Sequence, residues 1–382
     1  MIMKKSTISV RSGLNSDAQH GCVVPPITLS TTYNFFELNK PRPYDYSRRK
    51  NPTRDVAQKT LSDLECGTHA IMTSSGMSAI YLICSALLKP NDLLIAPHDC
   101  YGGTYRLLDA LNKKGTCKVL FINQNDTQMF LQSLAYKPKL IFIETPSNPM
   151  LRIVDIYAIC KSQKDTLYVV DNTFMTPVFQ NPLILGADLV VHSCSKYLNG
   201  HSDLIAGVVI SKDAYISDKL AWWGNTLGIT GSAFDSYQLL RGIRTLIPRV
   251  HQQQNNTKSI IAFCQKQPQI NELYYPGLSV HPGYAIACKQ QSGFGSIFSF
   301  ELKGNKNVLL RFLRSLKLFT LAESFGGVES LIAHPATMTH AAMPENVRKR
   351  AGISDMLLRV SVGLEDSDDL ITDLEQAFSS IQ

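Results

Sequence analysis

The chain has 382 residues, of which 44% are apolar and 18% charged, and its 38 basic and 31 acidic side chains give a net charge of +7. This composition excludes a disordered chain, and the length exceeds what one hydrophobic core supports, so two unequal domains are expected. The densest basic runs, at 48–50 and 348–350, are only three residues long. They argue against a nucleic-acid partner, and part of the excess charge would suit small anionic ligands instead.

Nine cysteines are scattered along the chain without a C-x-x-C pair, so neither a metal site nor a dithiol redox pair is predicted. Apolar surroundings, as at Cys84 and Cys264, predict buried free thiols in a reducing compartment. The N-terminal segment MIMKKSTISV lacks the apolar stretch of a signal peptide, and no apolar run is long enough to span a bilayer. A cytoplasmic protein without membrane partners is expected.

Residues 1–50 show little periodicity and are rich in Pro, Asn, Tyr and Arg, which predicts an extended polar arm. In residues 51–245, short β-branched apolar runs alternate with helix-like stretches such as MSAIYLICSALL. These runs are HAIMTS, DLLIAP, KVLFIN, KLIFIE, LYVVDN, DLVVHS and IAGVVIS. The alternation predicts a large α/β domain with a mostly parallel sheet covered by helices on both faces.

Residues 246–382 have a different pattern of apolar and polar residues. SIFSFEL and LLRVSVG are typical of strands, whereas NKNVLLRFLRSL and DSDDLITDLEQAF have the spacing of amphipathic helices. A smaller C-terminal α/β domain is therefore expected over 246–382.

Polar residues follow several of the predicted strands, at the edge where an open parallel sheet binds its ligands. Ser75-Gly76-Met77 opens a helix, where a glycine and unpaired N–H groups suit a phosphate. The other residues that follow strands are Tyr101, the rigid loop 145–149, Asp171, Ser193, Ser195 and Lys196.

Taken singly, these residues have ordinary structural explanations, since Asp171 could cap a turn and Lys196 could be a surface lysine. Together they form the set that pyridoxal phosphate needs. The set contains an amine for a Schiff base, a carboxylate for the pyridine nitrogen, an anion cradle and an aromatic ring. The sequence therefore predicts a pyridoxal-phosphate enzyme.

Longer motifs then identify a family. The chain resembles the cysteine/methionine-metabolism family of pyridoxal-phosphate enzymes, and within it the bacterial cystathionine γ-synthases. The motifs that carry the resemblance include VVPPITLSTTYNF, YDYSRRKNPTRD, APHDCYGGTYR, ETPSNPMLRIVDI, HSCSKYLNGHSD, FTLAESFGGVESL and TMTH. The resemblance implies an aspartate-aminotransferase-like fold (fold type I) with a seven-stranded sheet. It also implies a homotetramer built from two close dimers.

The resemblance assigns roles on the cofactor side. It implies that Lys196 forms the Schiff base and shuttles protons, that Asp171 faces the pyridine nitrogen, and that Tyr101 stacks on the ring. The implied phosphate ligands are Gly76, Met77, Ser193 and Ser195 from one subunit, with Tyr46 and Arg48 from its neighbour. Many relatives have Thr where this chain has Ser195, but the hydroxyl is retained.

On the substrate side, the resemblance implies that Arg359 grips the α-carboxylate through a two-pronged contact. Glu323, with the adjacent Ser324, resembles the acidic position of the γ-acting members. Arg49 and Arg106 resemble arginines near the distal end of the ester, and two extra cations suit a succinyl group. The implied reaction joins O-succinyl-L-homoserine to L-cysteine and gives L-cystathionine and succinate. Arg106 could instead be a surface residue, and Arg49 a counter-ion of the phosphate.

Other functions stay open at this stage. A catalytically inactive scaffold or a basic binding protein would not need the set Lys196, Asp171 and Arg359. Within the family, the alternatives are cystathionine β-lyase, cystathionine γ-lyase, methionine γ-lyase and the homoserine-ester sulfhydrylases. Gly103 lies where similar methionine γ-lyases tend to carry a cysteine, which argues against that activity.

Overall fold

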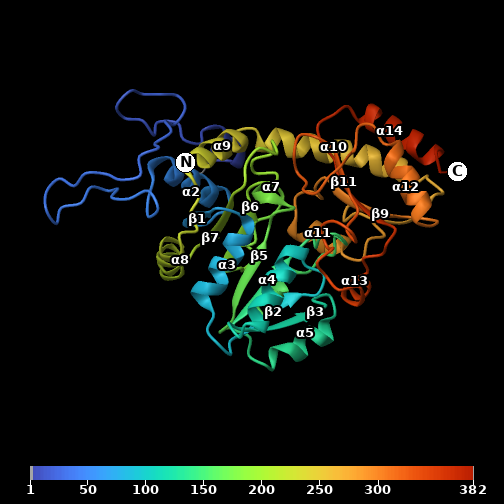
Figure 1. Ribbon diagram of the computed structural model, residues 1–382, viewed down its shortest axis with the longest axis horizontal. Coiled ribbons are helices and arrows are strands. Elements are labelled where there is room, and N and C mark those ends of the chain that lie inside the picture. Colours follow the sequence, from blue (N-terminus) through green and yellow to red (C-terminus); the bar gives the residue numbers. More distant parts are fainter. Residues whose placement is uncertain (1–2, 382) are drawn as a thin grey trace. The chain divides into compact units, whose positions relative to one another are not determined.

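The computed structural model, drawn in Figure 1, describes residues 3–381. These residues form two compact units. The first unit contains residues 3–89 and 167–247, and the second contains residues 90–166 and 248–381. No helix within residues 3–381 is long and apolar enough to cross a membrane. The expected arm over 1–50 and the domain boundary at 245 stay predictions.

The first unit carries four strands and most of its helices in the expected places. β5 and β6 are parallel, whereas β7 is antiparallel to both β6 and β1. Its elements are α1 (Lys5–Val10), α2 (Pro52–Leu64), β1 (His69–Thr73), α3 (Gly76–Leu87), β5 (Leu167–Asp171), α7 (Thr176–Phe179), β6 (Leu189–Ser193), β7 (Gly207–Ser211), α8 (Ala214–Leu227) and α9 (Ala233–Ile243).

Helices cover both faces of these strands, because successive side chains of a strand point to opposite sides. Ile71 of β1 faces α3 and α8, where it lies next to Gly224. Met72, the next residue, faces α2 and α9: its backbone N–H donates to Gln58 (2.9 Å) and its sulfur accepts from Ser236. The expectation of a sheet with helices on both faces is confirmed for this unit.

The second unit contains two groups of strands. β4, β2 and β3 are parallel neighbours, and a separate sheet has the order β10-β11-β12-β9-β8. The elements are β2 (Leu93–Pro97), α4 (Gly102–Lys113), β3 (Lys118–Ile122), α5 (Thr127–Leu134), β4 (Leu140–Glu144), α6 (Ile156–Cys160), α10 (Leu246–Cys264), β8 (Ile270–Tyr274), α11 (Tyr284–Gln290), β9 (Ile297–Leu302), α12 (Lys306–Ser315), β10 (Thr320–Leu321), β11 (Leu331–Ala333), α13 (Glu345–Ala351), β12 (Leu357–Ser361) and α14 (Ser367–Ser379).

Seven strands, in the order β1-β7-β6-β5-β4-β2-β3, make the large sheet. All seven correspond to the apolar runs in the sequence, and three of the five pairings between neighbours that are described are parallel. The predicted mostly parallel α/β sheet is confirmed.

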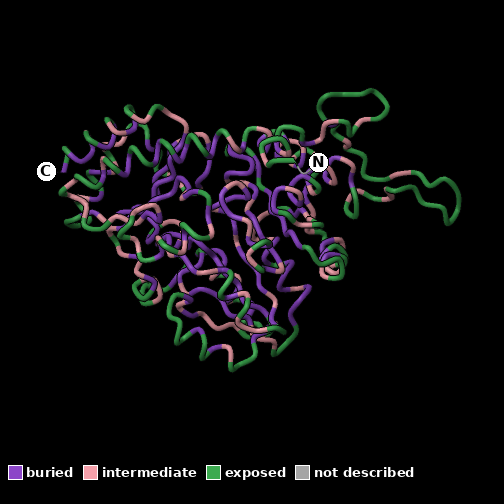
Figure 2. The backbone as a smooth tube through the Cα atoms, turned by 180° about the vertical axis from the view of Figure 1, so that it is seen from behind, coloured by how far each residue is buried: buried purple, intermediate pink, exposed green. Residues whose placement is uncertain are grey.

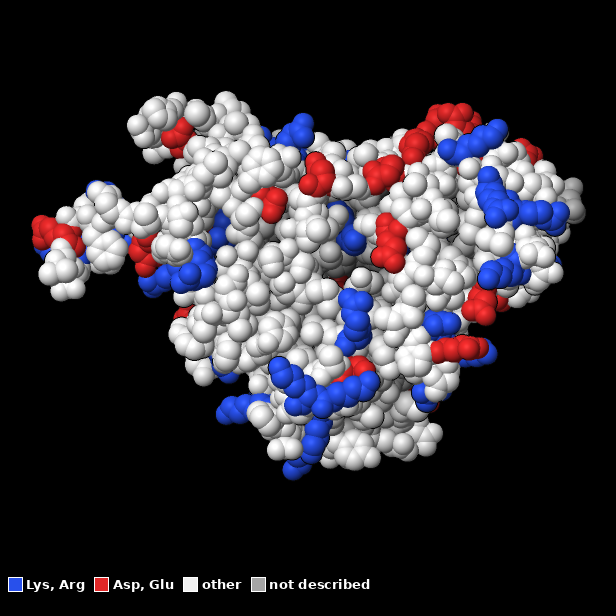
Figure 3. All heavy atoms as spheres, in the orientation of Figure 1, with Lys and Arg blue, Asp and Glu red and all other residues white. Residues whose placement is uncertain are grey.

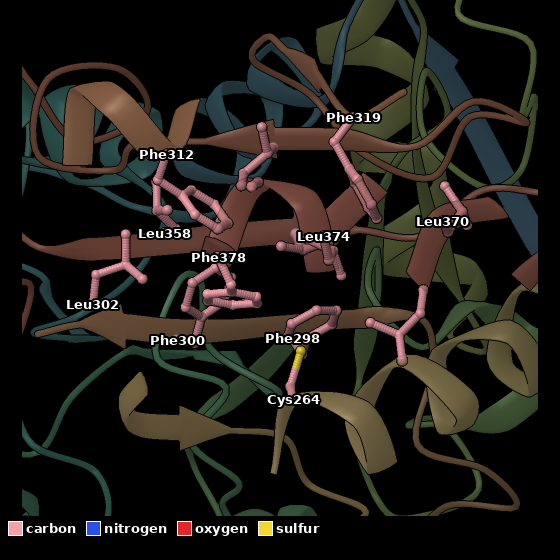
Figure 4. Close-up of a cluster of buried hydrophobic side chains, with 14 of the residues drawn as sticks. Cys264, Phe298, Phe300, Leu302, Phe312, Phe319, Leu358, Leu370, Leu374 and Phe378 are labelled. Carbon is pink, nitrogen blue, oxygen red and sulfur yellow. The ribbon is translucent and has the colours of Figure 1, made fainter. Parts of the chain in front are cut away.

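The five-stranded sheet packs its apolar side against α10, α12 and α14. Phe300 of β9, Phe312 of α12 and Phe378 of α14 meet in one cluster, with ring centroids 4.9–6.2 Å apart (Figure 4). Leu358 of β12 and Leu374 of α14 are fully buried in the same cluster. The predicted strands and amphipathic helices of the C-terminal part are confirmed, because these elements share one apolar core.

Most of residues 16–50 is exposed, and Figure 2 shows this stretch as extended loops. Basic and acidic side chains are interspersed on the face drawn in Figure 3, with basic atoms gathered near the position of α4 and β2. All nine cysteines are free thiols. The prediction that they are buried is wrong for Cys22, Cys66 and Cys288, which are exposed because they lie in a loop, a turn and a short surface helix.

Candidate functional site

In the first unit, the carboxyl ends of β1, β5 and β6 lie at the same edge of the sheet. Gly207, at the start of β7, is in register with both Thr73 of β1 and Ser193 of β6. A Cβ atom on Gly207 would lie 2.2 Å from the carbonyl oxygen of Ser75. Only glycine therefore lets the Ser75–Gly76 turn approach this edge so closely.

The turn begins α3, a helix of twelve residues. Ser75 caps this helix, since its Oγ accepts a hydrogen bond from the backbone N–H of Ser78 (3.0 Å). The first N–H groups, those of Gly76 and Met77, have no acceptor within the helix and carry the positive end of its dipole. A Cβ atom on Gly76 would lie 2.9 Å from the Cβ of Ser193. Gly76, Met77 and Ser193 thus form a small cradle that suits an anion such as a phosphate.

Asp171 ends β5 next to this cradle. Its Oδ1 accepts hydrogen bonds from the backbone N–H (2.9 Å) and hydroxyl (2.5 Å) of Thr173, and the Thr173 hydroxyl accepts from the N–H of Ser193 (3.0 Å). Burial raises the pKa of Asp171, and the hydrogen bonds from Thr173 oppose that shift. Asp171 therefore caps the turn that follows β5, which is the ordinary structural role considered for it above. A half-buried carboxylate of this kind is also suited to hold a cation, whose charge would stabilise the ionised form.

Lys196 and Ser195 lie in the turn that follows β6. The Lys196 backbone is fixed at both ends, because its N–H donates to Ser193 (3.2 Å) and its carbonyl accepts from Gly200 (2.8 Å). The Ser195 hydroxyl accepts from the N–H of Ala206 (3.1 Å). Both side chains are partly buried, so Lys196 is not a fully exposed surface lysine.

Tyr46, Arg48 and Arg49 are exposed in the N-terminal stretch. Arg48 lies over the Tyr46 ring (4.9 Å to its centroid) and its Nε donates to Asn225 (3.1 Å), whereas Arg49 pairs with Asp45 (2.8 Å). Within residues 3–381, these contacts link Arg48 to Tyr46 and Asn225 and link Arg49 to Asp45. They do not link either arginine to Gly76, Ser193 or Lys196. The structure keeps Tyr46 and Arg48 together and leaves Arg49 in an ion pair of its own.

The second unit holds Arg359 in the middle of β12, where its side chain is buried. Its Nη1 donates to Asn148 Oδ1 (3.0 Å) and its Nη2 to the Ser324 carbonyl (2.6 Å). The guanidinium also lies 5.2 Å from the centroid of the Phe325 ring. Ser324 has a φ of 86°, which is unfavourable for a residue with a side chain and is typical of functional loops.

Tyr101 precedes α4, and Glu144 connects it to the Asn148 loop. Glu144 Oε2 accepts from the N–H of Tyr101 (3.0 Å), and its Oε1 accepts from the N–H of Asn148 (2.8 Å). Burial raises the pKa of the Tyr101 phenol, Glu323 raises it further, and the cations of Arg106 and Arg359 lower it.

The substrate-side candidates Arg106, Glu323 and Arg359 are therefore close enough to act on Tyr101 through their charges. Arg106 itself is exposed on α4, and Glu323 is exposed in the loop before Ser324.

Four residues of these clusters were not singled out from the sequence: Thr173, Glu144, Asn148 and His340. The sequence does contain two signals, the rigid loop 145–149 and the motif TMTH. Neither of them predicts that Asn148 binds Arg359 or that His340 binds Asn148, because these residues are far apart in the chain. His340 is fully buried, and its ring lies edge-on to Tyr101 with centroids 6.5 Å apart.

Comparison with known proteins identifies the family to which this chain is similar. The profile of the family described as "Cys/Met metabolism PLP-dependent enzyme" matches residues 6–379. The chain belongs to this family. The predicted pyridoxal-phosphate cofactor is therefore confirmed at the family level, and so is the resemblance seen in the motifs.

Similar proteins include cystathionine γ-synthase of Escherichia coli strain K12, which is 59% identical over 380 residues, covering 99% of this chain and 98% of that protein. Cystathionine γ-lyase of Bacillus subtilis strain 168 is 40% identical over 381 residues, covering 99% of this chain and all of that protein. The crystal structure of cystathionine γ-synthase from Xanthomonas oryzae pv. oryzae in complex with cystathionine matches with a TM-score of 0.99 and 48% identity. It covers 100% of this chain and 99% of that one, which confirms the fold-type-I prediction.

Proposed function

We propose that this protein catalyses a γ-replacement that joins O-succinyl-L-homoserine to L-cysteine and releases L-cystathionine and succinate. The observation that carries the proposal is the 59% identity with the E. coli γ-synthase over nearly the whole of both chains. The Bacillus subtilis γ-lyase is 40% identical over a comparable length. A buried arginine near a tyrosine and an exposed glutamate is consistent with an amino-acid substrate.

The residues of the first unit fit pyridoxal phosphate. The cradle of Gly76, Met77 and Ser193 offers donors for a phosphate, namely the N–H groups at the start of α3 and the Ser193 hydroxyl, and Gly76 allows the close contact with Ser193. Ser195 adds a hydroxyl, and Asp171 is a half-buried carboxylate suited to a protonated pyridine nitrogen. When bound, the cofactor supplies an electron sink for the carbanion at the substrate α-carbon.

The remaining steps fall to side chains of this chain. Lys196 would hold the cofactor through its Nζ and, once released, would move protons one at a time: it would take the proton from the substrate α-carbon, pass it on, and only then take one from the β-carbon. The succinyloxy group would leave the γ-carbon as succinate, the cysteine thiolate would add there, and Lys196 would return the protons in the reverse order. Arg359 would hold the α-carboxylate, and Tyr101 would stack on the cofactor ring and assist amine exchange. The protein mainly supplies positioning and charge.

The selectivity for a succinyl ester would come from cations near its distal carboxylate. Arg106 and Glu323 both act electrostatically on Tyr101, which supports a role for them near a substrate bound at that residue. Arg49 would join them after exchanging its partner Asp45. Glu323 and Ser324 would hold the second amino acid.

We further infer a cytoplasmic homotetramer, a dimer of dimers, in which Tyr46 and Arg48 reach the phosphate of a neighbouring subunit. Exposed apolar residues in the N-terminal stretch, such as Leu29, Phe36 and Leu38, support an interface there. The role of Lys196 as the cofactor-binding lysine rests on the resemblance to the family, whereas the proposed domain boundaries at 50 and 245 rest on the changes in sequence pattern there.

Product analysis tests the function directly. The protein loaded with pyridoxal phosphate should convert O-succinyl-L-homoserine and L-cysteine to cystathionine, and it should use O-acetyl-L-homoserine less well. Omitting cysteine measures elimination of the ester, and supplying cystathionine alone measures lyase activity. Cleavage of cystathionine that is faster than its formation would make the protein a lyase and overturn the proposal.

A further inference from the structure

His340 is a fully buried histidine of the second unit to which the proposed reaction assigns no role. It lies in the segment between β11 and α13. Its neighbour Thr339 packs directly on the start of α4, because a Cβ atom on Gly102 would lie 2.3 Å from the Thr339 carbonyl oxygen. The His340 ring is therefore wedged between the loop that carries Asn148 and the residue that precedes α4, Tyr101.

The hydrogen bonds of His340 define which ring nitrogen carries the proton. Nε2 lies 2.9 Å from the carbonyl oxygen of Asn148, and Nδ1 lies 2.9 Å from the Thr339 hydroxyl. Burial and the nearby Arg359 cation lower the pKa of His340 to about 4, so the ring is neutral near pH 7. A carbonyl can only accept, so Nε2–H donates to Asn148, and the ring also interacts with the Thr339 hydroxyl and the Cys100 carbonyl.

Asn148 is held at three points. Its N–H donates to Glu144, its carbonyl accepts from His340, and its side-chain Oδ1 accepts from Arg359 Nη1. With the main chain fixed on both sides, the amide side chain has little freedom, and Arg359 gains a rigid acceptor. The other end of the guanidinium is held by the Ser324 carbonyl.

We propose that His340 is a positioning residue that fixes Asn148 and thereby holds Arg359 in the orientation that receives the α-carboxylate of the amino-acid substrate. The inference rests on the proposed function, which makes Arg359 the carboxylate site. His340 acts through Asn148 and does not touch the substrate. Its effect is therefore confined to ligands that carry an α-carboxylate, whereas a general loss of packing would weaken every ligand.

The test compares two ligands that differ only in this group, L-norvaline and n-butylamine. Their dissociation constants for the cofactor-loaded protein are measured by calorimetry, with the melting temperature of each variant as a second readout. His340→Leu should weaken L-norvaline about 3- to 10-fold, as expected for one lost hydrogen bond. It should leave n-butylamine within about twofold of the unaltered protein. His340→Gln, whose amide can donate to the same carbonyl, should recover most of the affinity.

Two further variants separate the possible failures. Combining His340→Leu with Asn148→Ala should weaken L-norvaline no more than Asn148→Ala does alone, because both act on one contact. If His340→Leu does not fold, the isosteric Thr339→Val decides, since it should produce a smaller loss with the same selectivity. Equal effects on both ligands, or none on either, would overturn the role of His340.

Arg359→Ala serves as the reference variant. It should abolish the preference for L-norvaline over n-butylamine. If that preference survives in Arg359→Ala, the carboxylate site of the proposed function is wrong. If it is lost there but unchanged in His340→Leu, only the present inference fails.

Discussion

Arg359 is a buried guanidinium whose Nη atoms donate to the Asn148 side chain and to the Ser324 carbonyl. Removing a cation from water costs several kcal/mol unless an anion or good hydrogen bonds compensate. A buried arginine whose guanidinium is held by an amide oxygen and a carbonyl is therefore suited to bind a ligand anion. The same reasoning applies to Asp171, a carboxylate whose pKa is raised by burial and which a bound cation would stabilise.

Lys196 gives the first prediction at the residue scale. Lys196→Ala removes both the amine that holds the cofactor and the group that moves protons. The turnover should fall by at least about 10⁴-fold, the upper end of what one general base contributes. Borohydride reduces a Schiff base to a stable amine and so fixes the cofactor to its lysine, so after this treatment the variant should carry little covalently attached cofactor. A variant with near-normal turnover would exclude Lys196 from this role.

Arg106 gives the second prediction. If its guanidinium binds the distal carboxylate of a succinyl ester, Arg106→Ala loses a charged contact worth about 1.5–3 kcal/mol. The kcat/KM for O-succinyl-L-homoserine should then fall about 10- to 150-fold, while that for O-acetyl-L-homoserine barely changes. Lys113→Ala, on the same helix but paired with Asp109, is the matched control and should affect neither ester. Equal losses for both esters in Arg106→Ala would remove the distal-carboxylate role.

At the scale of elements, the start of α3 is the feature most sensitive to shape. Gly76→Ala would place a Cβ 2.9 Å from the Cβ of Ser193, closer than real Cβ contacts, so the helix start must shift away from the cradle. We expect the affinity for pyridoxal phosphate, measured by titration of the cofactor-free protein, to fall at least about tenfold, the equivalent of 1.4 kcal/mol.

Gly224→Ala in α8 is the control for this substitution, because its added Cβ would have its nearest neighbours at 3.8 Å. Alanine is favoured over glycine in a helix by about 1 kcal/mol, so this variant should bind the cofactor normally and melt slightly higher. Normal cofactor affinity in Gly76→Ala would show that the phosphate binds elsewhere.

At the scale of the whole molecule, the exposed N-terminal stretch that carries Tyr46 and Arg48 predicts active sites that are shared between two subunits. If Tyr46 and Arg48 complete the phosphate site of a twofold partner, Arg48→Ala and Lys196→Ala damage different subunits of one site. Mixing the two inactive variants after reversible dissociation should restore part of the activity, because one site of each mixed dimer is then intact. Subunit exchange is followed with a mass-labelled variant. Exchange without recovery of activity would mean that Arg48 acts within its own chain.

The sequence by itself determined the seven strands of the large sheet, two strands and two helices of the C-terminal part, and the family, because these depend on local patterns. Runs of β-branched residues predict buried strands, and the motif around Lys196 indicates pyridoxal-phosphate chemistry from the sequence alone. The same patterns placed Gly76 at a helix start and Arg359 in a strand, and the structure has both there.

Only the tertiary structure decided the contacts that orient these residues. Asn148 and Arg359 are 211 positions apart, and Asn148 and His340 are 192 apart, so no local pattern encodes either hydrogen bond. Burial is likewise a property of the folded chain: it makes His340 neutral and raises the pKa of Asp171, whereas both side chains are solvated in an unfolded chain. The residue types that perform the chemistry can be read along the chain, but their orientation and charge depend on neighbours that only folding brings together.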